Sequence, residues 1–400
     1  MDKKTVRDLD LKGKRVLMRV DFNVPLDGST VTDDTRIRAA LKTIEYVLDA
    51  GASLVLMSHL GRPKGEAKPE FSLRPAADKL SELLGKPVAF APDCIGADVK
   101  AMADALQAGD VLLLENLRFH PEEEGKTVTS EAQEAFASEL ATLGDVYVND
   151  AFGTAHRAHA SMAVVTKHID ECAAGFLLEK EIEYLGKAVA TPEHPFVAVI
   201  GGAKISGKID VLRKLADKVD TIIVGGGMAY TFYVAKGIPI GDSLVETEKV
   251  ELAKETMALL ASKGVKLLLP IDHVVADAFS ADANVKTVDE AGIEDGWMAL
   301  DVGPKTAELF GAELATAKTV VWNGPMGCFE MAPFAAGTMS IARVVAATDC
   351  VSIIGGGDSV SAVNQSGLAV QMSHISTGGG ASLEFLEGKA LPGITALSDK

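Results

Sequence analysis

The chain has 400 residues, of which 48% are hydrophobic and 24% charged, enough to bury a sizeable core and to form two domains. Its formal net charge of −17 argues against a general nucleic-acid-binding surface, because such a surface needs clustered Lys and Arg. No apolar run reaches the roughly 18–20 residues of a membrane helix, and the N-terminus lacks the apolar segment of a signal peptide. We therefore expect a cytoplasmic protein that binds neither nucleic acid nor membrane. The four cysteines are far apart and lack zinc-ligand spacing, which indicates reduced thiols.

The first half repeats a short apolar strand that ends in polar or arginine-bearing residues. We expect such strands at residues 15–20, 53–57, 88–90, 111–114 and 146–148. Helices are expected from residues 33–35 to about 48 and over residues 72–84, where apolar residues recur at helical spacing. Ligands of open α/β sheets bind at the carboxyl ends of the strands, so the residues after each strand are candidates for a site.

Arginine recurs where these strands end. Arg62, Arg118 and Arg157 follow three of them, and Arg36 lies in the first turn of the first expected helix, where a cation opposes the helix dipole. A single arginine, or a single histidine such as His59, is more often a surface charge or a structural side chain. Four arginines at corresponding places in an acidic chain instead predict a site for a small, multiply charged anion, since guanidinium groups bind carboxylate and phosphate bidentately.

The second half repeats strand, glycines and helix. We expect strands at residues 196–200, 221–224, 266–269, 319–322, 351–354 and 375–377. Triple glycines follow three of them, at residues 225–227, 355–357 and 378–380. Such turns allow close backbone approach and expose N–H donors to a phosphate. Asp358 follows one of these turns and is placed to hold magnesium, although it could equally cap the next helix.

Two lysines follow the strand at residues 196–200. If a helix begins directly after Gly201 and Gly202, Lys204 and Lys208 share one helix face beside free N–H groups, which predicts a phosphate site. The spacing also matches the P-loop pattern GxxxxGK, but Ile209 stands where the pattern needs a Ser or Thr for magnesium. The alternative is an ordinary strand-to-helix turn with two solvated lysines.

A helical link is expected between the two halves. Leu178, Ile182 and Leu185 keep helical spacing, and the prolines of residues 191–195 then end the helix, so the boundary should fall near residues 186–195. These patterns predict an α/β protein of two doubly wound, mainly parallel-sheet (Rossmann-like) domains joined by a helical hinge. A dinucleotide fingerprint is missing, because Tyr230 and Val360 occupy the last position of GxGxxG.

Several segments carry a family resemblance. They are RVDFNVP (19–25), SHLGRP (58–63), ENLRF (115–119), DAFGTAHRAH (150–159), GGAK (201–204), GGGMA (225–229), WNGPMG (322–327), GGGD (355–358) and STGGGASLE (376–384). In them the chain resembles the phosphoglycerate kinase family, and the likeness covers essentially its whole length. The resemblance implies reversible transfer of the 1-phosphoryl group of 1,3-bisphosphoglycerate to ADP, giving 3-phosphoglycerate and ATP. It also implies ATP or ADP and Mg²⁺ as cofactors, and a monomer.

The resemblance implies two sets of site residues. The phosphoglycerate site would comprise Asp21, Phe22, Asn23, Arg36, His59, Leu60, Gly61, Arg62, Arg118 and Arg157. The nucleotide site would comprise Lys208, Gly225, Gly226, Gly303, Asn323, Pro325, Glu330 at the ribose hydroxyls, Gly355, Gly356, Gly357, Asp358 on magnesium, and Ser359. Arg36, Lys204 and Lys208 are expected to converge on the transferred group, with the amides of the glycine turns, Gly356 and Gly379 included, completing the cradle.

The resemblance also divides the chain. Residues 1–185 would bind phosphoglycerate, residues 186–390 would bind nucleotide, and residues 391–400 would return to the first domain. Because the two sets of site residues lie in different halves, catalysis should need hinge closure. Two positions depart from the family pattern. Ser359 stands where Thr is common and keeps the hydroxyl, and Cys328 replaces an aliphatic residue, which we expect to add thiol sensitivity.

Three other functions stay open at this point. A P-loop kinase of another class would explain Lys208 but predicts Ser or Thr at Ile209. A nicotinamide dehydrogenase would explain the doubly wound pattern but predicts a complete glycine fingerprint. A non-catalytic nucleotide sensor would need the glycine turns and would leave the arginines without a role.

Overall fold

The computed structural model describes residues 2–400, and the chain divides into two compact units. The first consists of the residues up to Glu183 together with Ala390–Lys400, and the second is Tyr184–Lys389. The division lies inside helix α6 (Phe176–Ala190), which ends directly before the proline-containing segment, as its sequence predicts. Among the described residues, none of the helices is long and apolar enough to cross a membrane.

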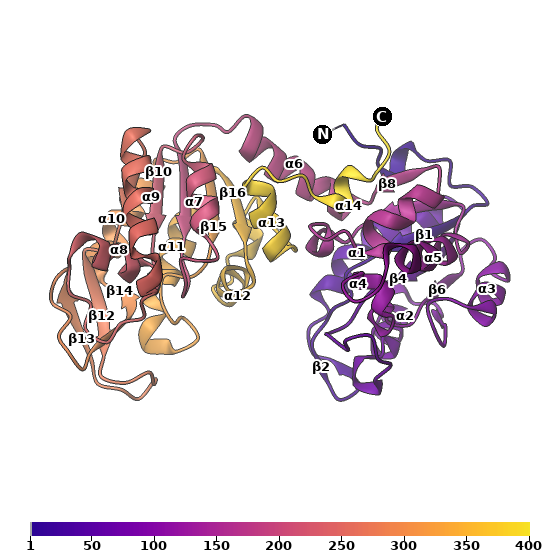
Figure 1. Cartoon of the computed structure of the whole chain (residues 1–400), viewed down its shortest axis with the longest axis horizontal. Helices are drawn as coiled ribbons and strands as arrows, with labels where there is room; N and C mark the ends of the chain where they lie inside the picture. The colour runs from indigo at the N-terminus through magenta and orange to yellow at the C-terminus, as the bar shows by residue number, and fades with distance from the viewer. Residues whose placement is uncertain (1) are drawn as a thin grey trace. The chain divides into compact units, whose positions relative to one another are not determined.

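A six-stranded parallel sheet forms the centre of the first unit (Figure 1). Its strands are, in spatial order, β5 (Ala89–Phe90), β6 (Val111–Leu113), β4 (Ser53–Met57), β1 (Arg15–Arg19), β7 (Val146–Asn149) and β8 (Cys172–Ala174). From β1 the chain first builds outward through β4 and later returns to the other side of β1 with β7. The strand order thus reverses beside β1, which is where doubly wound sheets bind ligands.

Helices α1 (Thr35–Asp49) and α2 (Arg74–Leu84) cover one face of this sheet. Ile37 and Ile44 of α1 and Leu80 of α2 join one apolar cluster with the β-strand residues, and burial of these side chains stabilises the layer. The other short elements of the unit are η1 (Val6–Asp8), β2 (Leu26–Asp27), β3 (Thr30–Val31), η2 (Pro69–Phe71), α3 (Ala97–Asp104), η3 (Leu117–Phe119), α4 (Pro121–Glu124), α5 (Ser130–Ala141), η4 (Phe152–Thr154), η5 (Ala160–Val164) and η6 (Val165–His168).

The C-terminal residues complete the first unit. After α14 (Pro392–Thr395), the Ser398 carbonyl accepts a hydrogen bond from the Lys4 N–H at 2.9 Å. Asn149, at the end of β7, donates its side-chain N–H to the Gly393 carbonyl at 2.8 Å. Figure 1 shows this yellow segment beside the indigo N-terminal residues. The two ends of the chain therefore belong to one folding unit.

The second unit is built on another six-stranded parallel sheet. Its strands are, in spatial order, β11 (Lys266–Leu268), β10 (Thr221–Val224), β9 (Phe196–Ile200), β15 (Thr319–Asn323), β16 (Val351–Gly355) and β17 (His374–Ile375). The order reverses beside β9, which pairs with both β10 and β15. The prediction of two doubly wound parallel sheets is confirmed.

Helices α10 (Pro304–Leu314) and α11 (Ala336–Ala347) cover one face of the second sheet. Phe310 and Ile341 pack there against Val197 and Trp322. The remaining helical elements are α7 (Ile209–Leu215), α8 (Ala229–Lys236), η7 (Thr247–Lys249), α9 (Val250–Ser262), η8 (Ala332–Phe334), α12 (Gly357–Gln365), η9 (Ala369–Gln371) and α13 (Gly379–Leu386).

The sequence patterns did not predict a second, antiparallel sheet in this unit. Strands β12 (Asp272–Ala276), β13 (Val285–Asp289) and β14 (Met298–Val302) pair in the order β13-β12-β14. The five residues of β13 alternate between exposed and half-buried, so the strand lacks the continuous apolar run by which the other strands were predicted.

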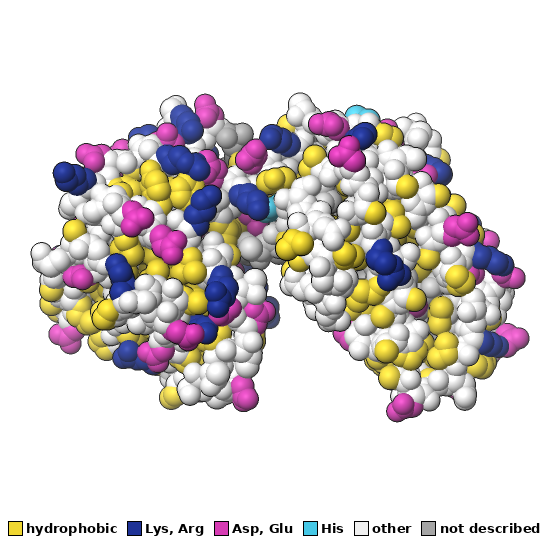
Figure 2. Space-filling model, turned by 180° about the vertical axis from the view of Figure 1, so that it is seen from behind, with side chains coloured by type: hydrophobic (Ala, Val, Ile, Leu, Met, Phe, Trp, Pro, Cys, Tyr) yellow, Lys and Arg dark blue, Asp and Glu magenta, His cyan; other side chains and the backbone are white. Residues whose placement is uncertain are grey.

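On the face shown in Figure 2, acidic and basic side chains alternate on each unit without forming a patch of one sign.

Candidate active site

In the first unit, polar side chains meet at the carboxyl ends of the central strands. Arg36 lies in the first turn of α1, as predicted, and its Nη1 is 3.1 Å from both carboxylate oxygens of Asp21, which follows β1. Asn23 Oδ1 accepts a hydrogen bond from the Gly61 N–H at 2.8 Å. The segment after β1 therefore holds both the arginine of α1 and the turn after β4.

Two further arginines join this group. Arg118 lies in η3, directly after β6, and its Nη1 donates to the Gly61 carbonyl at 2.8 Å. Glu124 Oε1 lies 3.7 Å from Arg118 Nε and 3.9 Å from Arg157 Nη1, so one carboxylate faces both guanidinium groups. Burial lowers the pKa of Arg118 to about 10, which leaves it a cation at neutral pH. Three guanidinium groups and two carboxylates thus meet at this edge of the sheet, and guanidinium groups are suited to binding carboxylate or phosphate.

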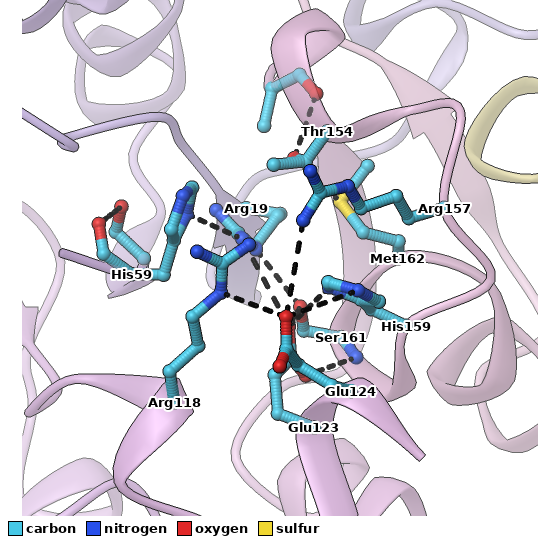
Figure 3. A network of polar contacts seen from close by, with 12 residues as sticks. Arg19, His59, Arg118, Glu123, Glu124, Thr154, Arg157, His159, Ser161 and Met162 are labelled. Carbon is cyan, nitrogen blue, oxygen red and sulfur yellow. Dashed lines mark hydrogen bonds and ion pairs between the residues drawn. The ribbon is translucent and has the colours of Figure 1, made fainter. Parts of the chain in front are cut away.

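A buried polar network lies among these residues (Figure 3). Arg19, the last residue of β1, donates from Nε to Ser161 Oγ at 2.9 Å, and its Nη2 is 3.2 Å from His59 Nδ1. Glu123 accepts hydrogen bonds from both the hydroxyl and the N–H of Ser161, at 2.7 and 3.0 Å. The sequence patterns assigned no role in the site to Arg19, Glu123 or Ser161. The available signal was Arg19 itself, a charged residue directly after the apolar run of β1.

Not all predicted substrate-site residues are placed to contact a ligand through their side chains. Phe22 is fully buried in the apolar core, where its N–H donates to Ser58 Oγ at 2.8 Å, and Leu60 is also buried. Gly61 has a φ of +61°, and a Cβ there would overlap the Phe71 ring. Arg62 is exposed. Hydrogen bonds and ion pairs join the other predicted residues directly or through the buried network. These residues are Asp21, Asn23, Arg36, His59, Gly61, Arg118 and Arg157.

In the second unit, the segment after β9 differs from the predicted helix. Helix α7 begins only at Ile209, so Lys204 and Lys208 do not share a helix face, and that prediction was wrong. Gly207 is a poor helix former, and Glu246 accepts a hydrogen bond from the Ser206 N–H at 2.9 Å, which holds the segment in a turn. Lys204 is consequently exposed and separated from Lys208 by this turn.

Lys208 instead points to the carboxyl ends of two strands. Its Nζ donates to the carbonyl oxygens of Gly201 and, at 3.2 Å, of Asn323. Burial lowers the pKa of this lysine to about 8, and nearby Asp358 opposes the shift. A half-buried ammonium group held by carbonyls is available to a phosphate that can supply a stronger interaction.

Two N–H groups of the first triple-glycine turn are already hydrogen-bonded within the protein. The Gly225 N–H donates to the Ile200 carbonyl at 3.1 Å, and the Gly226 N–H donates to the Met326 carbonyl at 3.0 Å. A Cβ on Gly226 would lie 2.6 Å from Gly202 N. The expectation that this turn exposes donors to phosphate was wrong for Gly225 and Gly226, because both glycines serve close packing of neighbouring backbone segments.

The second and third glycine turns lie together at the start of α12 and α13. A Cβ on Gly379 would be 3.4 Å from Gly356 Cα, so the N-termini of both helices are adjacent. Gly356 has a φ of +87°, and a Cβ there would lie 3.0 Å from Asn323 Nδ2. That Nδ2 atom is buried and has no hydrogen-bond partner within residues 2–400. Two helix N-termini and an unpaired donor form a place for an anion such as phosphate.

Several other predicted nucleotide-site residues make hydrogen bonds or close contacts within the second unit. Ser359 is buried and its Oγ accepts from the Gly324 N–H at 2.5 Å, and the Pro325 carbonyl accepts from the Gly202 N–H at 2.9 Å. Gly303 is buried against the Asp272 carboxylate, which caps α10. Glu330 is exposed.

The expected thiol sensitivity of Cys328 is not favoured by its surroundings. The residue is only partly exposed, and burial together with Glu330 and Asp301 raises the pKa of its thiol to about 11. Because the thiolate is the reactive form, this thiol is less reactive than an ordinary exposed cysteine at neutral pH.

The carboxylate of Asp358 fits a magnesium ion shared with a nucleotide. It is exposed in the first turn of α12, beside the adjacent helix N-termini, and Mg²⁺ is often held by one or two carboxylates plus substrate phosphates. Within residues 2–400, the one group of three metal-ligand side chains lies elsewhere, at Asp93, Cys94 and His120. There the His120 imidazole pairs with the Asp93 carboxylate at 2.7 Å, which accounts for their proximity.

The first unit brings arginines together, and the second brings together glycine-turn amides, a lysine and an exposed carboxylate. These features define a two-domain α/β kinase. A family model described as phosphoglycerate kinase matches residues 6–389. This chain belongs to the phosphoglycerate kinase family.

Individual relatives agree with this assignment. The chain is 60% identical to the phosphoglycerate kinase of Chloroherpeton thalassium and 61% identical to that of Moorella thermoacetica, with 100% of each chain covered. Its structure is similar to that of phosphoglycerate kinase from Coxiella burnetii, with a TM-score of 0.88, 42% identity and 98% of each chain covered. The enzyme from Pyrococcus horikoshii OT3 matches with a TM-score of 0.85, 32% identity and the same coverage.

Proposed function

We infer that this protein transfers the 1-phosphoryl group of 1,3-bisphosphoglycerate reversibly to ADP, giving 3-phosphoglycerate and ATP, a step of glycolysis and gluconeogenesis. The observation that carries this conclusion is the arginine set of the first unit, where Arg36, Arg118 and Arg157 surround the ends of one sheet. A protein that only senses a nucleotide would not need this set of arginines. Family membership over residues 6–389 supports the same reaction.

In the first unit, the substrate is a triose acid with phosphate and carboxyl groups. We propose that Arg36, His59, Arg62, Arg118 and Arg157 bind these anionic groups. Asp21 and Asn23 orient Arg36 and the turn at Gly61, as their hydrogen bonds indicate. The intramolecular contacts of Glu124 with Arg118 and Arg157 are long, at 3.7 and 3.9 Å, so a phosphate can replace them with shorter, charge-assisted hydrogen bonds.

In the second unit, the nucleotide phosphates would occupy the adjacent N-termini of α12 and α13. The amides of Gly356, Gly357 and Gly379 and the unpaired Asn323 Nδ2 support this placement. Lys208 would neutralise phosphate charge, and Asp358 would hold Mg²⁺, which would supply further positive charge to the phosphates. Glu330 is proposed at the ribose hydroxyls, and Lys204 and Arg36 as further cations at the transferred group.

The reaction needs no general base. The attacking oxygen is ionised in either direction, since it belongs to an ADP phosphate or to the carboxylate of phosphoglycerate. Phosphoryl transfer passes through a loose transition state with charge spread over the transferred group, so the protein mainly positions the reactants and stabilises charge. Cations and backbone N–H groups are the appropriate residues for this chemistry.

An assay of ATP formation tests the reaction directly. The purified chain, supplied with 1,3-bisphosphoglycerate, ADP and Mg²⁺, should form ATP at a rate typical of kinases, roughly 1–100 turnovers per second or more. Replacing Mg²⁺ by a chelator should abolish the activity. Nucleotide binding without any ATP formation would contradict the enzyme assignment and favour a sensor.

We further propose that the two units close around their substrates, and that the enzyme works as a monomer in the cytoplasm. The substrates bind to different units, so in-line transfer requires the reacting atoms to come within about 3–3.5 Å of each other. Small-angle scattering should show a smaller radius of gyration with both substrates bound than with either alone. An unchanged radius would contradict closure, and a mass of two chains would contradict the monomer.

A further inference from the structure

The side chain of Arg19 is completely buried at the end of β1, so it is not placed to contact a ligand itself. Each of the three guanidinium nitrogens contacts a group of the protein. Nε donates to Ser161 Oγ at 2.9 Å, Nη1 donates to the Val20 carbonyl, and Nη2 lies 3.2 Å from His59 Nδ1 (Figure 3). Arg19 therefore acts on the site only through its neighbours.

The position of the Arg19 guanidinium is itself fixed. Glu123, which is also completely buried, places Oε1 4.0 Å from Arg19 Nη2 and supplies the opposite charge. The Glu123 carboxylate is held by the hydroxyl and the N–H of Ser161, and His159 Nδ1 lies 3.6 Å from it. A buried charge pair whose members are hydrogen-bonded on several sides has little freedom to move.

The contact between Arg19 and His59 determines where the imidazole carries its proton. A guanidinium group offers only N–H donors and stays protonated in proteins, so it cannot accept a hydrogen bond from His59. The Nδ1 atom of His59 must therefore be the acceptor, which leaves the proton of the neutral ring on Nε2. Protonation at Nδ1 would set two N–H groups against each other in a buried place.

The other groups that face His59 also favour the neutral ring. They come from different elements: Arg19 from β1, Arg118 from η3, Arg36 from α1, and His159 from the segment before η5. Burial, followed by the charge of Arg19 and then by the other neighbours, holds the pKa of His59 well below its ordinary value. The ring is consequently a directional hydrogen-bond donor and contributes no charge.

We propose that Arg19 is a positioning residue that keeps His59 in its neutral, Nε2-protonated form, so that Nε2–H donates to an anionic oxygen of the substrate. The role of His59 toward substrate rests on the function proposed above, whereas the tautomer does not. In this arrangement the arginines supply the charge that attracts the substrate, and His59 supplies a hydrogen bond of fixed direction.

Nitrogen NMR of the ¹⁵N-histidine-labelled protein tests the tautomer without any assay of activity. The signal of His59 is identified by its loss in His59→Gln. We expect a proton on Nε2 and a bare Nδ1 throughout pH 5.5 to 8. An imidazolium at pH 6.5, or a proton on Nδ1, would overturn the proposal. A chain that lacked kinase activity but showed the expected tautomer would contradict only the proposed function.

A double-mutant cycle tests the positioning role. Arg19→Met is combined with Glu123→Gln, so that no carboxylate is left buried without its partner charge. We expect the KM for 3-phosphoglycerate to rise about tenfold, the effect of losing one well-placed hydrogen bond to a charged group, with the KM for ATP unchanged. In a His59→Gln background the same pair of substitutions should add no further increase. A tenfold increase there as well would show that Arg19 serves only packing.

Ser161→Ala is the milder variant, and it is informative if the charge-pair variant does not fold. It removes the hydroxyl that accepts from Arg19 Nε but keeps both buried charges. We expect the His59 signal to lose its single-tautomer signature and the KM for 3-phosphoglycerate to rise about two- to threefold. A spectrum and a KM identical to those of the unsubstituted enzyme would count against the positioning network.

Discussion

The two units place their candidate site residues at the same edge of the same kind of sheet but use different parts of the chain. In the first unit the groups are side chains, chiefly Arg36, Arg118 and Arg157, held by carboxylates and carbonyls. In the second unit they are mainly backbone N–H groups at the starts of α12 and α13. A site made of side chains should lose function when a side chain is truncated. A site made of backbone N–H groups should lose function when a side chain is added to one of its glycines.

The largest effect is expected from removing a side chain of the first site. Arg36→Ala should lower kcat by about 10²–10³-fold, because one preorganised cation at a transferring phosphoryl group contributes on that order. The Arg36 side chain is partly exposed, so circular dichroism and the midpoint of thermal unfolding should stay close to those of the unsubstituted enzyme.

Arg38→Ala is the matched control for this prediction. Arg38 lies in the same helix turn, is more exposed, and forms its ion pair with Asp34. We expect its kcat to remain within about twofold of normal, because surface ion pairs contribute little. A kcat above a tenth of normal for Arg36→Ala would remove Arg36 from the proposed set.

A smaller effect is expected from adding one methyl group to the second site. Gly356→Ala should raise the KM for nucleotide about tenfold, since its φ of +87° strains any other residue and the added Cβ would press on Asn323 Nδ2. Gly357→Ala is the control, because a Cβ there meets nothing within 4 Å. Equal values of KM for the two variants would show that the backbone conformation at Gly356 does not determine the affinity for nucleotide.

The smallest effect concerns pH. With its pKa lowered to about 8, Lys208 loses its proton as the pH rises through 8, so kcat/KM for nucleotide should fall to about half its plateau at that pH. Lys208→Arg should abolish this decrease of kcat/KM at high pH, because arginine stays protonated. Lys214→Arg, in the exposed part of α7, should retain the decrease. A decrease that persists unchanged in Lys208→Arg would assign the titration to another group.

The sequence predicted the side-chain groups of the first unit better than the backbone groups of the second. For the first unit, the arginines after the strands predicted a common anion site, and the structure brings Arg36, Arg118 and Arg157 to one edge of the sheet, because parallel strands end there. For the second unit, repeated glycines did not distinguish Gly226, whose N–H is bound to the Met326 carbonyl, from Gly356, which begins a helix. Glycine is required both for close packing and for ligand approach, so the residue type alone does not separate the two uses.

The sequence by itself determined the α/β class, the two sheets, the position of Arg36 in a first helical turn and the family. These features depend on local hydrophobic patterns and on motifs that are read along the chain. Only the tertiary structure decided that Lys208 faces strand carbonyls, that the N-termini of α12 and α13 adjoin, and that Arg19 contacts His59, forty residues away in sequence. Such contacts depend on which strands become neighbours, and no local pattern of residues records that pairing.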